Sequence, residues 1–189
     1  MPGRPPDIEG YVTAEADRRT RFEALFAECH PPVRAYALRR APFDVAQDVV
    51  AETFLVAWRR LDDVPRSEPL PWLYRVARGV LANARRSAAR ADALVARAGA
   101  AEPPPASCDP GERLGDAEVV RSALAALSEA DREVIMLVAW EGLDAVAAAR
   151  AAGCSRATFA VRLHRARRRL AAALAHERDP VPDLEPVES

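Results

Sequence analysis

The sequence predicts an all-α protein with two small helical domains joined by a flexible linker, the C-terminal domain containing a helix-turn-helix. Apolar residues recur at helical spacing through most of the chain, and no strand-like alternation appears. A Pro-rich, nearly patternless stretch, "AEPPPASCDPGE", interrupts this periodicity. The predicted organisation is a flexible N-terminal segment (1–18), a first domain (19–90), a linker (91–113), a second domain (114–176) and an acidic tail (177–189).

Composition favours a helical protein and argues against a secreted or membrane-inserted one. The 189 residues suit one medium domain or two small ones. Half of them are hydrophobic but only 6% are aromatic, so the core must be mainly Ala, Leu and Val, and abundant Ala favours helix. Neither a signal peptide nor membrane insertion is expected, because "MPGRPPDIEG" has no apolar stretch and no apolar run approaches a membrane span. We expect a cytoplasmic protein.

No residue pattern indicates catalysis or metal binding. The cysteines are odd in number and far apart, which predicts free thiols in a reducing compartment: Cys29, Cys108 and Cys154. The carboxylates are dispersed, the three histidines have no partner spacing, and there is no nucleophile motif. The expectation is a protein that is not an enzyme and uses neither cofactor nor metal.

The first domain is expected to contain four helices. Apolar positions in residues 22–29 have helical spacing, and Pro31 and Pro32 are expected to stop or restart that helix. A short second helix precedes Pro42, and Asp44 is the expected N-cap of a third, "VAQDVVAETFLVAWRRL". A loop with three prolines follows, and then a helix from about residue 72 to residue 90.

The second domain begins near Asp116, and its helix boundaries have clear signals. Ser128 opens a helix that Gly142 is expected to end, with a capping-box-like start. The segment "LDAVAAARAAG" predicts a short helix ending at Gly153, and Ser155 is expected to cap a final, longer helix. A short helix, a Gly-containing turn and a longer basic helix together predict a helix-turn-helix.

Charge is distributed unevenly along the chain. All 27 basic residues are Arg, and the net charge is −1. Yet residues 150–176 contain seven Arg and no acid, whereas the last thirteen residues contain five acids and one Arg. The final helix should bury Phe159, Leu163, Ala166 and Leu170 and expose Arg on either side. An Arg-biased protein with a solvated basic face is the alternative, but the turn and the lack of acids favour DNA binding.

Two blocks resemble a known family. The first is "FEALFAECHPPVRAYALRRAPFDVAQDVVAETFLVAWRRL" with "PWLYRVARGVLANARR", and the second is "ALAALSEADREVIMLVAWEGLDAVAAARAAGCSRATFAVRLHRARRRL". In this order and at this separation they resemble extracytoplasmic-function (ECF) sigma factors, the small two-domain class of bacterial RNA polymerase sigma subunits. The resemblance covers about residues 22–90 and 116–174. It implies a protein that binds core RNA polymerase, recognises promoter DNA and helps to open it.

The resemblance implies binding to core polymerase through the β′ coiled coil and the β flap. Acids beside apolar anchors suit a partner surface, because charge steers the encounter and apolar groups hold it. A plain amphipathic core helix is the alternative, in which Phe54 and also Trp58 would be core. The residues that match the polymerase-binding segment are Asp48, Glu52, Thr53, Phe54, Leu55 and Trp58.

The loop 61–71 and the helix after it match the part of the family that reads and melts the minus-10 promoter element. Capture of unstacked bases needs stacking faces and basic groups for the strand backbone. For Trp72, packing at a helix start is an equally good interpretation. The matching residues are Trp72, Tyr74, Arg75, Arg78, Gly79, Asn83, Arg85 and Arg86.

The final helix matches the helix that reads the minus-35 element. In a helix-turn-helix the early residues of the second helix reach base edges, so later arginines are expected to contact phosphates or polymerase. The candidates are Arg156, Thr158, Arg162, His164, Arg165, Arg167 and Arg169.

The resemblance also implies an anti-sigma partner and a protein that is monomeric when free. The chain departs from the family pattern at Ala51, Gly79 and Ala160, which puts its promoter specificity in question. Two other interpretations stay open: a helix-turn-helix transcriptional regulator, and a degenerate sigma factor that acts only through protein interaction. The acidic tail is a solvated segment by default, and screening of the basic helix is the alternative.

Overall fold

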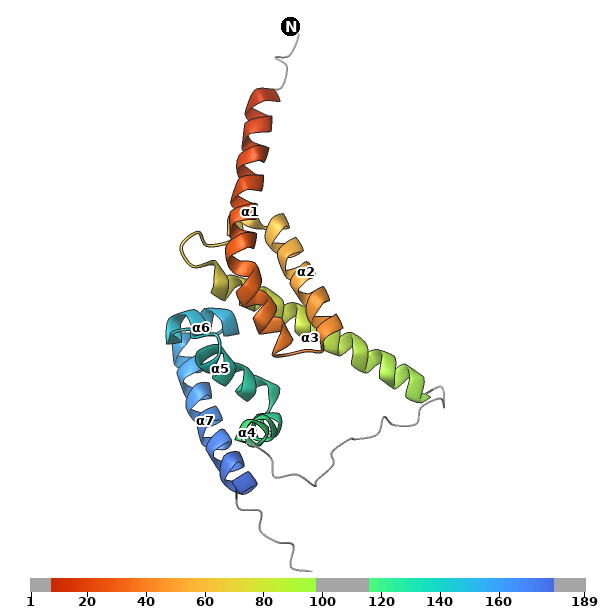
Figure 1. Cartoon of the computed structure of the whole chain (residues 1–189), viewed down its shortest axis with the longest axis vertical. Helices are drawn as coiled ribbons and strands as arrows, with labels where there is room; N and C mark the ends of the chain where they lie inside the picture. Colours follow the sequence, from red (N-terminus) through yellow and green to blue (C-terminus); the bar gives the residue numbers. More distant parts are fainter. Residues whose placement is uncertain (1–7, 98–115, 179–189) are drawn as a thin grey trace, which may run out of the picture. The chain divides into compact units, whose positions relative to one another are not determined.

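The computed structural model describes residues 8–97 and 116–178, and its regular secondary structure within these ranges is entirely helical. The chain divides into two units, residues 1–100 and 101–189 (Figure 1). The all-α organisation in two units predicted from the sequence is therefore confirmed. Most of the predicted linker, the acidic tail beyond residue 178 and Cys108 lie outside the described residues.

The first unit is built from three long helices that all pack against one another (Figure 1). They are α1 (Ile8–Leu38), α2 (Phe43–Arg59) and α3 (Pro69–Arg97), with a short 3-10 helix, η1 (Leu61–Asp63), between the last two. Val50, Phe54 and Ala57 form a buried stripe on α2 that continues into Leu61 of η1, which is 1% exposed. Against it, the rings of Tyr36 on α1 and Tyr74 on α3 stack with centroids 4.7 Å apart. Aromatic stacking therefore joins α1 to α3 beside an otherwise aliphatic core.

The prolines of α1 do not end the helix, so that prediction is wrong. Helix α1 runs through Pro31 and Pro32 as far as Leu38 and includes the segment expected to be a separate helix. The two prolines leave the carbonyls of Ala27 and Glu28 without an intrahelical donor, but both residues are exposed and water can satisfy them. The helix also begins at Ile8, so residues 8–18, expected to be flexible, are helical.

Two other helix starts differ from expectation. Pro42, not Asp44, is the N-cap of α2, and it makes no side-chain capping bond. Asp44 lies in the first turn, where its charge still favours the helix dipole. Helix α3 starts at Pro69, earlier than predicted, because the first turn has no intrahelical partner for its N–H groups and so tolerates proline. It continues to Arg97, into the segment assigned to the linker.

The second unit packs three shorter helices against one long one (Figure 1). These are α4 (Asp116–Ala125), α5 (Glu129–Ala139) and α6 (Ala145–Ala152), all of which contact α7 (Arg156–Arg178). Phe159 and Ala166 of α7 are fully buried, as predicted, whereas Leu163 and Leu170, also predicted to be buried, are half-buried. Five alanines of α6 are buried as well, and such small side chains let α7 approach α6 closely.

The helix-turn-helix is formed by α6, a tight turn and α7, and Gly153 and Ser155 occupy the helix boundaries predicted for them, whereas the N-cap Asp144 was not predicted. The Asp144 carboxylate accepts hydrogen bonds from the backbone N–H groups of Val146 and Ala147, both at 2.8 Å. These bonds hold the pKa of Asp144 below its usual value. Gly153 has a left-handed backbone, φ 67°, which ends α6, and the Ser155 hydroxyl accepts from the N–H of Thr158.

Arg132 stabilises the second unit by capping the end of α4. Its guanidinium donates to the carbonyls of Leu124, Ala125 and Leu127 at 2.8–3.1 Å. We expect Arg132→Ala to lower the local stability of α4 and α5 by about 1–2 kcal/mol, because these carbonyls lose a charged donor. Hydrogen exchange of the α4 and α5 amides in the full chain measures this. Arg121→Ala is the matched control, since its exposed pair with Glu118 contributes little; equal effects of both changes would contradict the prediction.

Both cysteines in the described residues are free thiols. Burial, with a smaller contribution from Glu28, raises the pKa of the Cys29 thiol to about 11. The Cys29 thiol is therefore almost entirely protonated at pH 8 and inaccessible. We expect iodoacetamide to alkylate the half-buried Cys154 at least roughly a hundredfold faster than Cys29, as followed by mass spectrometry. In urea the difference should disappear; rapid labelling of Cys29 in the folded protein would contradict its burial.

Candidate functional site

The predicted polymerase-binding residues on α2 divide between the core and the surface. Asp48, Glu52 and Leu55 lie on the exposed side, and Leu55 is 40% exposed. Thr53 and Phe54 are buried, at 0% and 3% exposure, so they cannot form part of a contact surface and that assignment is corrected. The Thr53 hydroxyl donates to the Val49 carbonyl within α2 at 2.6 Å. We call the exposed side, with Asp48, Glu52 and Leu55, the acidic face of α2.

An aromatic cluster links α1 to α2. The half-buried Trp58 ring meets Phe22 edge-on, with centroids 5.2 Å apart, and the guanidinium of Arg18 lies 5.1 Å from its centroid. Phe26 stacks on His30 at 4.8 Å and contacts Phe54, yet it is 41% exposed. The spacing of Phe26 predicted a core position, so the sequence pattern did not identify it as a surface residue. Only its exposure in the folded unit reveals an apolar group that a partner could cover.

Most predicted minus-10 residues lie along one side of α3. Trp72, Arg75, Gly79, Asn83 and Arg86 follow one another at helical spacing, and all except the half-buried Trp72 are exposed. The guanidinium of Arg60 lies 6.0 Å from the Trp72 ring, and Arg86 donates to the Asn83 side-chain oxygen. This side of α3 therefore combines an indole, an amide and guanidinium groups.

The other three predicted minus-10 residues lie off this side. Tyr74 is 2% exposed and stacked on Tyr36, so its ring is not a stacking surface for DNA and the prediction is wrong. Arg78 is half-buried on a neighbouring side of the helix. Arg85 donates to the carbonyl of Arg40 at 2.9 Å, which ties α3 to the residues just after α1.

The start of α7 is an exposed, mainly basic surface. Arg156, Thr158, Arg162 and Arg165 are all exposed. The hydroxyl of Thr158 lies 2.9 Å from that of Ser155, which orients both at the helix start. Val161, which the sequence pattern did not single out, is 50% exposed beside these arginines. An exposed valine among arginines can contact a thymine methyl group while the arginines bind guanine or phosphate.

The other three predicted minus-35 residues are placed differently from Arg162 and Arg165. His164 is exposed, but two positions along a helix it lies about 160° around the axis from Arg162 and faces another side. Arg169 forms an ion pair with Asp131, which is largely buried at the start of α5. Arg169 therefore joins α7 to α5, and its contact with DNA stays a prediction. Arg167 is exposed on the flank of α7 opposite Arg162.

Comparison with known proteins decides the family. Residues 25–91 match the Sigma-70 region 2 family, and residues 117–170 match the Sigma-70, region 4 family. The ECF RNA polymerase sigma factor SigL of Mycobacterium tuberculosis (strain H37Rv) is 32% identical over 168 residues, which cover 86% of this chain and 92% of SigL. The chain belongs to the ECF sigma factor family. It is an RNA polymerase sigma factor.

Further relatives support the same assignment of this ECF sigma factor. EcfG of Rhodopseudomonas palustris (strain TIE-1) is 31% identical over 76% of this chain and 80% of its own length. Among solved structures, the sigma factor RpoE in complex with the anti-sigma factor NepR from Bartonella quintana is 28% identical, with a TM-score of 0.62 over 82% of this chain and 96% of RpoE. CnrH, solved with the cytosolic domain of CnrY, is 30% identical with a TM-score of 0.56 over 82% of this chain and 87% of CnrH.

The exposed surfaces described above lie within the two family regions of this ECF sigma factor. The region 2 match contains the acidic face of α2 and the exposed side of α3, and the region 4 match contains the helix-turn-helix. Within residues 8–97 and 116–178, no helix has both the length and the apolar character needed to cross a membrane. The same described ranges hold no cluster of metal-ligating side chains.

Gly79 is one of the positions at which the sigma factor departs from the family pattern, and nothing in the structure requires a glycine there. A Cβ added there meets nothing within 4 Å, and the backbone is helical. We expect Gly79→Ala to raise the unfolding free energy of the first unit by about 0.5–1 kcal/mol, because glycine loses more backbone entropy in a helix. Thermal unfolding measures this, with the reciprocal change Ala88→Gly on exposed α3 as control. A loss of stability in Gly79→Ala would contradict the regular helix at residue 79.

Proposed function

We propose that this sigma factor uses the acidic face of α2 to bind the β′ coiled coil of core RNA polymerase. Asp48 and Glu52 give the face its charge, and Leu55 supplies an exposed apolar anchor in the same stretch of helix. The aromatic cluster behind it packs α2 onto α1 through Trp58 and Phe54, so the face is presented on a rigid support. The second unit would contact the β flap.

The side of α3 from Trp72 to Arg86 would read and help to open the minus-10 element. It supplies Trp72 as a stacking group and Arg75 and Arg86 as backbone contacts. Gly79, where the chain departs from the family pattern, offers no side chain to a base, so base recognition at that position would be weaker or different. The minus-35 element would be read by the start of α7, with Arg162 and Arg165 in the major groove.

An anti-sigma factor is the further partner that we propose. Two structural relatives, RpoE and CnrH, were both solved in complexes, RpoE with an anti-sigma factor and CnrH with the cytosolic domain of CnrY. Such a partner would cover surfaces otherwise used for polymerase. Such regulation would take place in the bacterial cytoplasm, where polymerase and promoter DNA are found, and it would require no catalytic role of the protein itself.

The observation that carries this proposal is the presence of both sigma regions in one chain, each with an exposed surface of the required chemistry. It is tested by mixing the labelled chain with core polymerase and adding promoter fragments from the same organism. A complex with core that shifts only some upstream fragments supports the proposal. Binding to core without any promoter-dependent shift favours a degenerate sigma factor, and binding to DNA without core favours an ordinary helix-turn-helix regulator.

A further inference from the structure

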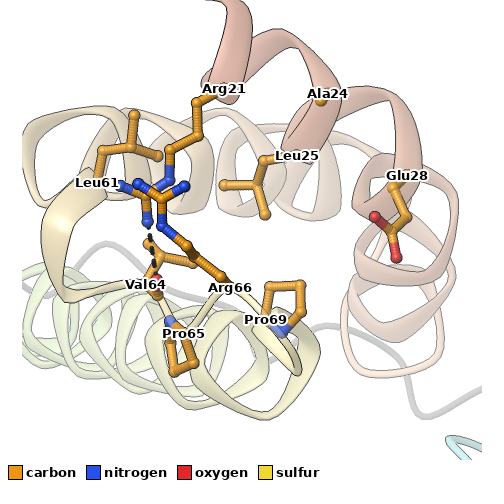
Figure 2. Close-up of a pocket in the computed structure, with 9 residues that line it drawn as sticks. All are labelled: Arg21, Ala24, Leu25, Glu28, Leu61, Val64, Pro65, Arg66 and Pro69. Atoms are coloured by element: carbon orange, nitrogen blue, oxygen red, sulfur yellow. Dashed lines mark hydrogen bonds between the residues drawn. The ribbon is translucent and has the colours of Figure 1, made fainter. Parts of the chain in front are cut away.

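Two arginines of α1 hold the segment that connects α2 to α3. Arg18 donates to the carbonyl of Trp58, in the last turn of α2, and its guanidinium lies 3.6 Å from the Asp62 carboxylate. Arg21 lies one turn further along α1, 3.3 Å from the same carboxylate. It also donates to the carbonyl of Val64 at 3.0 Å (Figure 2). The two arginines therefore bind the end of α2, η1 and the start of the following loop.

The loop held in this way has little packing of its own. Leu61 and Val64 are buried, but residues 65–68 are exposed. Behind the loop lies a cavity of about 220 Å³, with Ala24, Leu25 and Glu28 of α1 on one side and Pro65, Arg66 and Pro69 on the other (Figure 2). Because residues 65–68 are exposed and border this cavity, only the polar anchors and the buried side chains of Leu61 and Val64 fix the position of the loop.

The same loop leads directly into the side of α3 that carries Trp72. Figure 2 shows the side chains of Arg21 and Arg66 reaching into the same cavity from opposite elements. Arg66 is exposed and has no acidic partner among the described residues, so it is available to a DNA phosphate. A side chain that must bind an unstacked DNA strand does so best when the protein already holds it in its binding position.

We propose that Arg18 and Arg21 are positioning residues for promoter opening, holding the connection between α2 and α3 in the shape that receives the separated strand. This inference rests on the proposed function of the first unit. The two arginines need not touch DNA; they act through Asp62 and through the carbonyls of Trp58 and Val64. Arg21 is the better probe, because Arg18 also contacts the Trp58 ring near the proposed polymerase surface.

The test compares transcription by core polymerase and the full chain from two templates that share one promoter. One template is fully duplex, and the other is already unpaired over the minus-10 element. We expect Arg21→Ala to lower transcription from the duplex by about tenfold, the loss expected for one charge-assisted hydrogen bond to a positioned group. On the unpaired template the loss should be small, since unstacking is no longer required. Asp62→Asn should show the same pattern more weakly.

Arg19→Ala is the matched control, because Arg19 is the exposed neighbour on α1 and has no partner in the described part of the chain. Thermal unfolding of each variant separates positioning from stability, since a purely structural role would reduce both templates equally. Equal losses on both templates, or no loss on the duplex, would overturn the inference. If the unmodified protein gives no promoter-dependent transcript, the proposed function fails instead, so the two failures are distinguishable.

Discussion

Core RNA polymerase should bind at least roughly a hundredfold more weakly to a variant that carries Asp48→Arg and Glu52→Arg together. Both carboxylates lie on the acidic face of α2 and are exposed, so the exchange should not disturb the core. Reversing two charges at a complementary interface introduces repulsion and is expected to cost about 3 kcal/mol or more. Fluorescence anisotropy of the labelled chain, titrated with core polymerase at fixed salt, measures the change.

The matched control reverses two exposed acids of α1, Glu15 and Glu23, which changes the net charge equally. That variant should retain near-normal affinity, because the effect of Asp48 and Glu52 is local and not a consequence of overall charge. Similar losses in both variants would mean that polymerase senses only net charge. An unchanged affinity in the α2 variant would remove this face from the interface.

Loss of minus-35 recognition is the second large effect that we expect. Arg162→Ala combined with Arg165→Ala should weaken binding to minus-35 DNA by about 2 kcal/mol or more, roughly thirtyfold, because each arginine can make a bidentate base contact or bind phosphate. The slope of log affinity against log salt should also become shallower by about one for each phosphate that the variant no longer binds. Arg121→Ala, on exposed α4 in the same unit, is the control.

The single change Arg165→Ala separates the two roles of that arginine. If Arg165 reads a base, the variant should tolerate substitution at one promoter position and bind the original site about 1–3 kcal/mol more weakly. If it binds phosphate, affinity should fall equally on all sequences. A variant that binds every sequence as well as the unmodified protein would show that the start of α7 is not the recognition surface.

Local signals predicted much of the second unit correctly. Ser128 and Gly153 occupy the boundaries of their helices, and Ser128 accepts a hydrogen bond from the N–H of Asp131 as a capping residue should. The burial of Phe159 and Ala166 follows from helical spacing alone. These features are local in sequence, so the residue pattern is sufficient to find them.

The errors arose where distant residues decide the outcome. The ion pair of Arg169 was missed, because its partner Asp131 lies 38 positions away and no local pattern reveals it. The anchors Arg18 and Arg21 were missed for the same reason, since their acceptors lie about forty residues along the chain. Tyr74 was different: its spacing from Ala77 and Leu81, three and then four residues, was a core signal that the family resemblance outweighed.

The continuity of α1 through Pro31 and Pro32, where an interruption was predicted, has a physical explanation too. Pro31 and Pro32 were weighed as helix breakers, yet Val33 and Tyr36 immediately after them are fully buried. Packing of these side chains against the rest of the unit offsets the two missing hydrogen bonds. Propensity is a weak guide when tertiary burial follows directly in the sequence.

Run-off transcription is the most direct test of the central claim, that this ECF sigma factor initiates transcription through the surfaces on α2, α3 and α7. Core polymerase from the same organism is supplied with a library of upstream regions, with and without the protein. We predict defined transcripts that appear only with the protein and share two sequence elements upstream of their start sites. A protein that binds core firmly but yields no transcript from any region would contradict initiation by this chain.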